Sequence, residues 1–181
     1  TNVATVSNMV DDASIGECTY SVVEDTDKIT VDSEGKVTIN GAGTFTIKAV
    51  YEESGCYNSS SATYKLQINK ADQTISFDQN EYEIYVGEEF TRPLADVTEG
   101  TQGGTGKVTY TLVTDGDAVS GSIVNFVGED NDYSLDLLNK PGVVGIQATK
   151  EACDDYNEAI TSYTLNVIRN EQGLGPDNKI A

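Results

Sequence analysis

The stretch that decides the fold is "DKITVDSEGKVTINGAGTFTIKAV", Asp27 to Val50. Two short runs rich in Val, Ile and Thr flank the turn-forming residues Asp32 to Gly35, and a longer run of the same kind starts at Gly43. Apolar and polar residues alternate in these runs, as they do in a strand with one buried face. Asp and Gly are typical of tight turns. The stretch therefore predicts three β-strands, each with one apolar face.

The rest of the 181-residue chain continues this pattern. Short runs rich in β-branched and aromatic residues recur roughly every 8–12 residues, separated by Gly, Asn, Asp and Ser. No convincing segment places apolar residues at the 3.6-residue spacing of a helix. The chain is therefore predicted to be all-β, with sheets that bury their apolar faces against each other. Its length allows one domain or two small ones.

Two segments of the chain recur. "CTYSVVEDTD" from Cys18 aligns with "VTYTLVTDGD" from Val108 at an offset of 90 residues. "YNSSSATYKLQI" from Tyr57 aligns with "YNEAITSYTLNV" from Tyr156 at an offset of 99 residues. The difference of nine residues predicts an insertion in the second copy, in or near "SGSIVNFVGEDNDYSLDLL". We expect two tandem domains, at residues 1–69 and 70–169, followed by a linker or tail at 170–181.

The first copy lacks the opening of the second. "KADQTISFDQNEYEIYVGEEF" ends just before Thr91, which aligns with Thr1, and it supplies two predicted strands. A sandwich without its first strand has an unpaired edge. We expect either that the chain is an excerpt of a longer array or that another segment or molecule supplies the strand. The junction "INKADQT" is short and polar, so it should leave the two domains little freedom.

The stretch from Asp27 to Val50 resembles the bacterial immunoglobulin-like domains that occur in tandem in invasin- and intimin-type adhesins and other surface proteins. That family runs through a strand, an Asp-x-x-Gly turn, a second strand and a Gly-Thr-x-x-Ile-x-Ala strand. Here these elements are Ile29 to Val31, Asp32 to Gly35, Lys36 to Ile39 and Gly43 to Ala49. The second copy lacks the turn but keeps the last element as "GVVGIQA". The resemblance extends over residues 1–168 and implies two immunoglobulin-like β-sandwiches of a surface protein.

Charge and composition exclude several classes of function. Asp and Glu number 30 against 11 Lys and Arg, a net charge of −19, which repels nucleic acids and anionic membranes. No apolar run is long enough to span a bilayer. The chain has no His, the commonest general base and zinc ligand, and only three isolated Cys. We therefore predict that the chain is not an enzyme and has no cofactor.

The cysteines allow one disulfide. In a sandwich of this type, the positions of Cys18 and Cys56 lie at the same end of neighbouring strands. A Cys18–Cys56 disulfide is therefore a candidate, and it would suit an extracellular setting. The alternative is two free thiols in a protein from a reducing habitat. Cys153 has no paired counterpart, because Val108 stands at the position that matches Cys18.

Acidic loops and tyrosines are the other candidates for a site. "GEDND" in the predicted insertion brings together Glu129, Asp130 and Asp132, which are candidate calcium ligands, although such residues also cap turns. Pairs of Asp recur after the aligned strand of each copy, at Asp25/Asp27 and at Asp115/Asp117. Tyrosines at the domain ends could stack on sugars or pin the loops onto the sandwich: Tyr51, Tyr57 and Tyr156.

The resemblance implies a structural or adhesive role at the bacterial cell surface or in a secreted protein. We expect a stiff spacer or part of an adhesin, with neighbouring repeats of the parent protein as its partners. The alternative is a glycan- or protein-binding module that uses loops at one end of a sandwich. Exposed aromatic side chains would favour the alternative, whereas buried tyrosines would favour the spacer.

Overall fold

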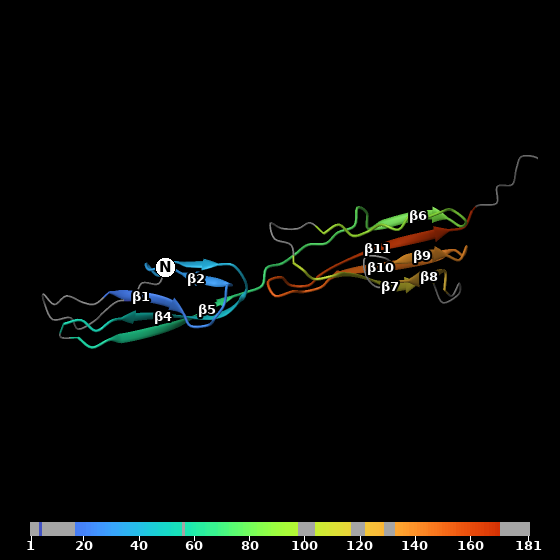
Figure 1. Cartoon of the computed structure of the whole chain (residues 1–181). Helices are drawn as coiled ribbons and strands as arrows, with labels where there is room; N and C mark the ends of the chain where they lie inside the picture. Colours follow the sequence, from blue (N-terminus) through green and yellow to red (C-terminus); the bar gives the residue numbers. More distant parts are fainter. Residues whose placement is uncertain are drawn as a thin grey trace, which may run out of the picture. The chain divides into compact units, whose positions relative to one another are not determined.

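The computed structural model describes residues 4, 17–55, 57–97, 104–116, 122–128 and 133–170 of the chain. All of the regular elements in these ranges are β-strands, which confirms the all-β prediction. The chain divides into two compact units, Thr1–Ala71 and Asp72–Ala181 (Figure 1). In the described residues no helix is long and apolar enough to cross a membrane.

Unit 1 contains a three-stranded antiparallel sheet and a separate hairpin. The sheet has the order β1-β4-β5, with β1 at Cys18–Val22, β4 at Gly43–Tyr51 and β5 at Ser60–Ile68. The hairpin consists of β2 (Ile29–Val31) and β3 (Val37–Ile39). Among the described residues of this unit, three apolar side chains form the buried core: Ile29, Phe45 and Ile47. The alternating pattern of the sequence thus places one face of each strand towards a small core.

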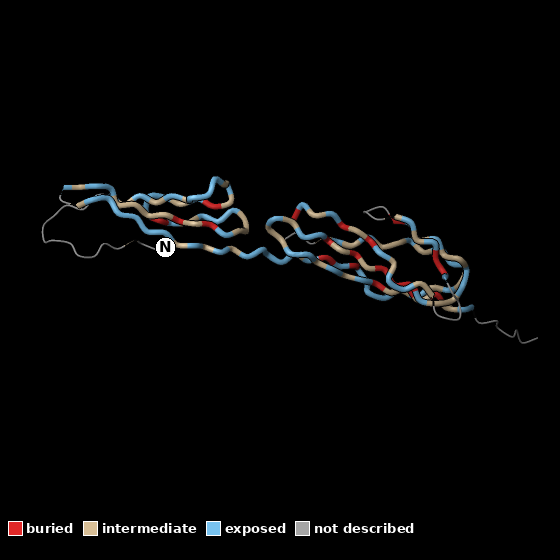
Figure 2. Tube along the Cα trace, turned by 90° about the horizontal axis from the view of Figure 1, so that it is seen from below, coloured by how far each residue is buried: buried red, intermediate tan, exposed pale blue. Residues whose placement is uncertain are grey.

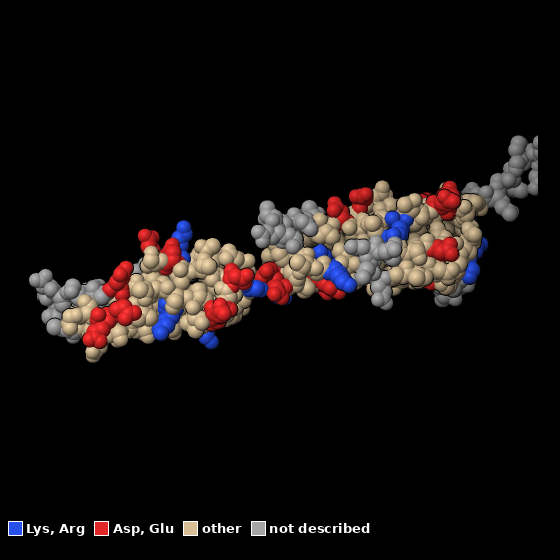
Figure 3. Space-filling view, in the orientation of Figure 1, with Lys and Arg blue, Asp and Glu red and all other residues tan. Residues whose placement is uncertain are grey.

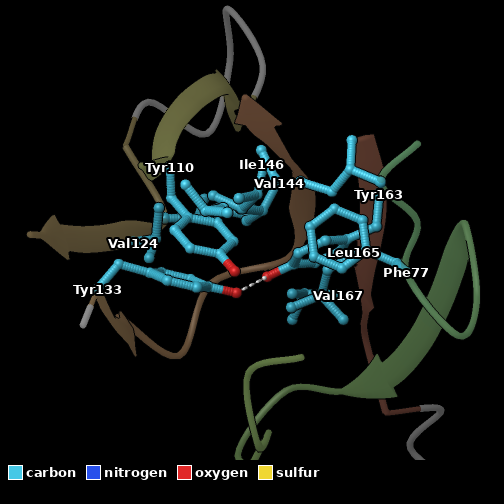
Figure 4. Close-up of a cluster of buried hydrophobic side chains, with 13 residues drawn as sticks. Phe77, Tyr110, Val124, Tyr133, Val144, Ile146, Tyr163, Leu165 and Val167 are labelled. Carbon is cyan, nitrogen blue, oxygen red and sulfur yellow. Dashed lines mark hydrogen bonds between the residues drawn. The ribbon is translucent and has the colours of Figure 1, made fainter. Parts of the chain in front are cut away.

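As far as the residues are described, unit 2 has the same plan with one additional strand. Its sheet has the order β6-β11-β10-β7, formed by β6 (Glu81–Tyr85), β7 (Val108–Asp115), β10 (Gly142–Lys150) and β11 (Ala159–Ile168). A second hairpin is formed by β8 (Val124–Val127) and β9 (Ser134–Leu137). β6 runs parallel to β11, whereas the other pairs are antiparallel. Buried residues are more numerous here than in unit 1 (Figure 2), and they form one aromatic-rich core (Figure 4).

Strand pairing repeats between the units at the offsets seen in the sequence. Phe45 faces Leu66 in the β4–β5 pair, and 99 residues later Val144 faces Leu165 in the β10–β11 pair. Tyr20 faces Ala49 in the first unit. Tyr110 and Ala148, at offsets of 90 and 99, face each other in the second. The two units are therefore built on the same sheet register.

The nine additional residues of unit 2 enter before, within and after its hairpin. Ile29 and Ile39 form the base of the first hairpin, and Val124 and Leu137 form the base of the second. The offset is 95 between Ile29 and Val124 and 98 between Ile39 and Leu137. It therefore rises by five residues before the hairpin, by three within it and by one after it.

The Asp-x-x-Gly turn of unit 1 is closed by its own aspartate. The carboxylate of Asp32 accepts hydrogen bonds from the backbone N–H groups of Glu34, at 3.0 Å, and Lys36, at 2.8 Å. Gly35 has a φ of +76°, a conformation that residues with a Cβ atom rarely adopt. The side chain of Asp32 and the glycine thus account for the tight turn between β2 and β3.

One of the two strands predicted at the start of the second copy is not a regular strand. Ser76 and Asp96 form an isolated bridge, with N–H···O distances of 2.9 and 2.7 Å in the two directions. Pro93 stands three residues before Asp96 and has no N–H to donate, which shortens any ladder on that side. The second predicted strand is observed as β6.

Candidate binding surface

The stretch "CDDYNEA" lies in the turn that joins β10 to β11. The N–H of Cys153 donates to the carbonyl oxygen of Tyr156 at 3.0 Å. In unit 1, Ser54 and Tyr57 exchange two hydrogen bonds of 3.0 and 3.1 Å at the position 99 residues earlier. Both tyrosines are half-buried. The recurring Tyr-Asn pair therefore belongs to a turn that both units contain.

The opening of unit 2 is bound to this turn. The side-chain amide of Gln73 donates to the carbonyl oxygens of Glu151, at 2.9 Å, and Asn157, at 2.7 Å. The side-chain amide of Asn157 donates in turn to the carboxylate of Asp72 at 2.8 Å. These polar groups fix the place where the chain enters the unit. No sequence pattern points to Asp72 or Gln73, because their partners are distant in sequence.

Cys153 is a half-buried cysteine in this turn and is not part of a disulfide. The backbone N–H of Asp155 makes the largest contribution to a lowered pKa of this thiol, and the N–H groups of Tyr156 and Thr105 lower it further. Desolvation opposes the shift but is outweighed. A Cβ atom at Gly104 would lie 2.9 Å from the sulfur, so the segment that leads into β7 passes close to it. The thiol is therefore held by backbone groups on one side and by packing on the other.

The predicted disulfide stays a prediction. Cys18 is a free, half-buried thiol at the start of β1, opposite Tyr51 of β4. Desolvation raises the pKa of the Tyr51 phenol, and the adjacent Cys18 thiol raises it further. Cys56 lies outside the described residues.

The acidic pairs have different roles in the two units. The Asp115 carboxylate accepts hydrogen bonds from the Ser122 hydroxyl and from the N–H groups of Ile123, at 2.7 Å, and Val124, at 3.1 Å. Desolvation would raise the pKa of Asp115, but these hydrogen bonds outweigh it and lower the pKa below its usual value. Asp25 and Asp27 are exposed. Asp115 thus shapes the connection that leads into the β8–β9 hairpin.

The candidate calcium ligands belong to the loop between β8 and β9. Glu129, Asp130 and Asp132 lie outside the described residues, as does Asp117. Within the part of the chain that the structure describes, no three His, Cys, Asp or Glu side chains are grouped as metal ligands. A calcium site in the loop between β8 and β9 stays a prediction. On the visible face of each unit, acidic and basic side chains are interspersed (Figure 3).

The tyrosines mainly pack the sandwiches. Of the ten tyrosines, all of which are described, only Tyr85 is exposed, at 45%. The Tyr163 ring contacts Phe77 edge-on at a centroid distance of 4.9 Å, and Tyr82 at 5.5 Å. Tyr110 stacks on Tyr133 at 4.5 Å (Figure 4). The described aromatic side chains therefore do not form the flat exposed platform that glycan stacking would need.

Part of the first unit matches a known family of protein domains. Residues 4–51 match the family model described as the intimin immunoglobulin-like domain. The resemblance seen around the Asp32 turn is thereby confirmed over those residues, which include the hairpin β2–β3 and the strands β1 and β4. No curated protein sequence matches the chain.

Solved structures that are similar to this chain include the following three. Drosophila N-cadherin repeats 1–3 are 16% identical, with 88% of this chain and 57% of that chain covered and a TM-score of 0.36. Domains 1–6 of the surface layer protein SbsC are 17% identical, with coverages of 85% and 20% and a TM-score of 0.38. A SusE-like surface located polysaccharide binding protein from Bacteroides thetaiotaomicron is 15% identical, with coverages of 88% and 30% and a TM-score of 0.35. The chain spans less than two thirds of each of these structures.

Proposed function

We propose that the chain is a non-catalytic mechanical spacer in an adhesive protein of the bacterial cell surface or a secreted protein. One observation carries this proposal: unit 2 receives the chain at one end of β11 and releases it at the other. Gln73 is bound to Asn157, two residues before β11 begins, and the chain leaves after Ile168, the last residue of β11. A ten-residue strand spans about 33 Å. Each such unit therefore adds length along a line.

The parallel pairing of β6 with β11 supports a mechanical role. Because β6 follows the entry of the chain and β11 precedes its exit, a pull on the two ends draws these strands in opposite directions. The N–H of Thr164 donates to Asn80, and the N–H of Val86 donates to Ile168, both at 2.9 Å. Such bonds lie across the direction of pull and are loaded together. The connection between the units also supports the proposal, since only residues 69–71 separate β5 from Asp72, which is bound to Asn157.

The match to the intimin domain supports the proposed location and partners. Domains of this kind belong to surface proteins, so the chain is proposed to act outside the cell, with neighbouring repeats of its parent protein as direct partners. The acidic composition, with a net charge of −19, keeps such a module soluble and disfavours contact with nucleic acid or anionic lipid.

Single-molecule pulling on the two ends of the full chain tests the proposal. We expect two unfolding events, with unit 2 resisting the higher force because of its β6–β11 pair. Ile84→Pro removes an N–H from the edge of β6 that faces β11. Backbone groups alternate in direction along a strand, and those of Asn80 and Val86 bind β11, so the N–H of Ile84 points the same way. The matched change Glu83→Pro removes an N–H from the opposite edge. A lower unfolding force for Ile84→Pro than for Glu83→Pro is expected, whereas equal forces would contradict the proposal.

Recognition of a glycan or host protein through end loops is the second candidate. The half-buried state of Tyr51, Tyr57 and Tyr156 disfavours it. A glycan array probed with the full chain distinguishes the two functions. Specific binding that is abolished by Tyr57→Ala or Tyr156→Ala, in a chain that remains folded, would replace the spacer proposal with a binding module.

A further inference from the structure

Asn40 and Gly41 directly follow β3, the second strand of the hairpin in unit 1. Among the asparagines of the sequence, Asn40 is the only one that glycine follows. An asparagine in this setting is chemically labile, because glycine has no side chain to keep its own backbone nitrogen away from the asparagine side chain. The two residues are therefore a candidate site of covalent modification.

The base of the β2–β3 hairpin holds both groups that such a reaction needs. The N–H groups of Asn40 and Gly41 both donate to the carbonyl oxygen of Lys28, at 2.8 and 3.1 Å. The side-chain amide of Asn40 donates to the carbonyl oxygen of Asp27 at 3.0 Å. Asn40 is nevertheless exposed, so water reaches its side chain. The closed hairpin thus binds the nitrogen of Gly41 and the side-chain amide of Asn40 without excluding water.

The hairpin of unit 2 is closed without an asparagine. Lys28 corresponds to Ile123 and Asn40 to Leu138, at the offsets of 95 and 98 that hold for the two strands of the hairpin. The N–H of Leu138 donates to the carbonyl oxygen of Ile123 at 2.8 Å, as that of Asn40 does to Lys28. The backbone bond at the base of the hairpin therefore does not require the labile pair, which is a feature of unit 1.

We propose that Asn40 is a site of spontaneous deamidation that is gated by the base of the β2–β3 hairpin. When the base opens, the backbone nitrogen of Gly41 gives up its proton and attacks Cγ of Asn40. The new N–Cγ bond closes a succinimide ring, and Nδ2 leaves with that proton as ammonia. Water then adds to one of the two ring carbonyl carbons and opens the ring to aspartate or isoaspartate. No electrons are transferred, and water is the only co-reactant.

The products cannot close the hairpin as asparagine does. Aspartate at position 40 has no N–H to donate to the carbonyl oxygen of Asp27, and it adds a negative charge next to this exposed acidic residue. Isoaspartate also lengthens the backbone by one carbon atom, which moves the N–H of Gly41 away from the Lys28 oxygen. The modification therefore weakens the hairpin permanently, and an opening of unit 1 is recorded in its covalent structure.

Peptide mass spectrometry of the full chain in mildly alkaline buffer measures the conversion of Asn40. In urea that unfolds unit 1, the conversion should be at least about tenfold faster than in native buffer, because opening of the hairpin limits the reaction in the folded chain. Gly41→Ala should slow the conversion in urea, since its methyl group hinders the attacking nitrogen. Asn139, which Lys140 follows, is the internal reference and should remain an amide over the same time.

Variants of the hairpin turn change the gate and leave the labile pair intact. Asp32→Ala removes the acceptor of the Glu34 and Lys36 N–H groups. It should raise the hydrogen exchange of the Gly41 amide and the deamidation rate by the same factor, at least about fivefold. Glu34→Ala, in the same turn, keeps the Asp32 carboxylate and should change neither rate. If Asp32→Ala does not fold, urea below the unfolding midpoint gives the same comparison in the unaltered chain.

Each part of the proposal has a result that would overturn it. Equal conversion in native buffer and in urea would show that the hairpin does not gate the reaction. An Asn40 that stays as stable as Asn139 in urea would show that the pair is not reactive. Unchanged protection of the Gly41 amide in Asn40→Asp would show that the aspartate product still closes the hairpin. The inference does not rest on the spacer function, so none of these results alters the outcome of the pulling experiment.

Discussion

Tyr133 stacks on Tyr110 in unit 2 at the place where Gly35 meets the ring of Tyr20 in unit 1. The ring centroids of the two tyrosines are 4.5 Å apart. A Cβ atom added to Gly35 would lie 3.0 Å from Cε1 of Tyr20. Gly35 and Tyr133 are 98 residues apart, the offset of the second strand of each hairpin. Equivalent tyrosines are thus covered by backbone in one unit and by an aromatic ring in the other.

Gly35→Ala should destabilise unit 1 by about 2–4 kcal/mol, because it combines an unfavourable positive φ with contact against Tyr20. Gly55→Ala is the matched control: its φ is +59° and nothing lies within 4 Å of the added carbon, so it should cost only about 1–2 kcal/mol. Urea unfolding of the full chain measures both. Equal losses for the two variants would show that the Tyr20 contact contributes nothing.

Tyr133→Phe should destabilise unit 2 by about 1–3 kcal/mol, because it leaves the Pro93 carbonyl without its donor. The Tyr133 hydroxyl donates to that oxygen at 2.7 Å and lies 3.2 Å from the Tyr163 hydroxyl. Tyr163→Phe keeps the bond to Pro93 and should cost less, about 0.5–1.5 kcal/mol. Thermal unfolding of the single and double variants gives the coupling between the two hydroxyls. A larger loss for Tyr163→Phe would contradict this assignment.

Unit 2 should lose stability in alkaline solution. Burial raises the pKa values of the Tyr163 and Tyr133 phenols above their usual value. Since the unfolded chain then loses these protons first, the stabilisation is complete below about pH 10 and decreases above it, by up to about 1.4 kcal/mol per pH unit and tyrosine. Urea midpoints measured from pH 9 to 11.5 test this. The urea midpoint of the Tyr133→Phe/Tyr163→Phe double variant should fall less steeply with pH. An equally steep fall in the double variant would show that the two phenols do not cause the loss of stability.

Asp115→Asn should destabilise unit 2 by about 1–2 kcal/mol at neutral pH, because the charged acceptor of three hydrogen bonds is lost. The pKa of Asp115 is lowered in the folded unit, so its contribution is present above about pH 4 and is lost as the pH falls through the folded value. Asp136→Asn, on the exposed side of β9, changes the net charge equally and serves as the control. If Asp115→Asn does not change how the stability of unit 2 falls in acid, this role of Asp115 is contradicted.

The Cys18–Cys56 pairing can be decided by mass measurement. The chain is purified under oxidising conditions, alkylated, and weighed with and without prior reduction. If the two cysteines pair, the unreduced chain should accept one alkyl group, at Cys153, and the reduced chain three. Three groups in both samples would show that Cys18 remains a thiol, as it is in the structure.

The sheet framework was readable from the sequence, because the alternation of Phe45, Ile47 and their counterparts follows directly from the burial of one strand face. The offsets of 90 and 99, from which two copies of one domain were predicted, recur in the strand pairings of the two units. The role of Tyr133 was hidden, because it lies where the copies do not align and its partners are set by three-dimensional packing. The hydrogen bonds of Gln73 were hidden for the same reason, since the acceptors are 78 and 84 residues away.

The two hairpins differ in length although the sheets beside them keep one register. The second hairpin is three residues longer than the first, one residue in each strand and one between the strands, and five further residues enter before it. Even so, β10 and β11 pair as β4 and β5 do. Sequence length can therefore change at this hairpin without disturbing the sheet. For protein engineering, the connection between β8 and β9 is a natural place to graft a foreign peptide epitope onto this scaffold.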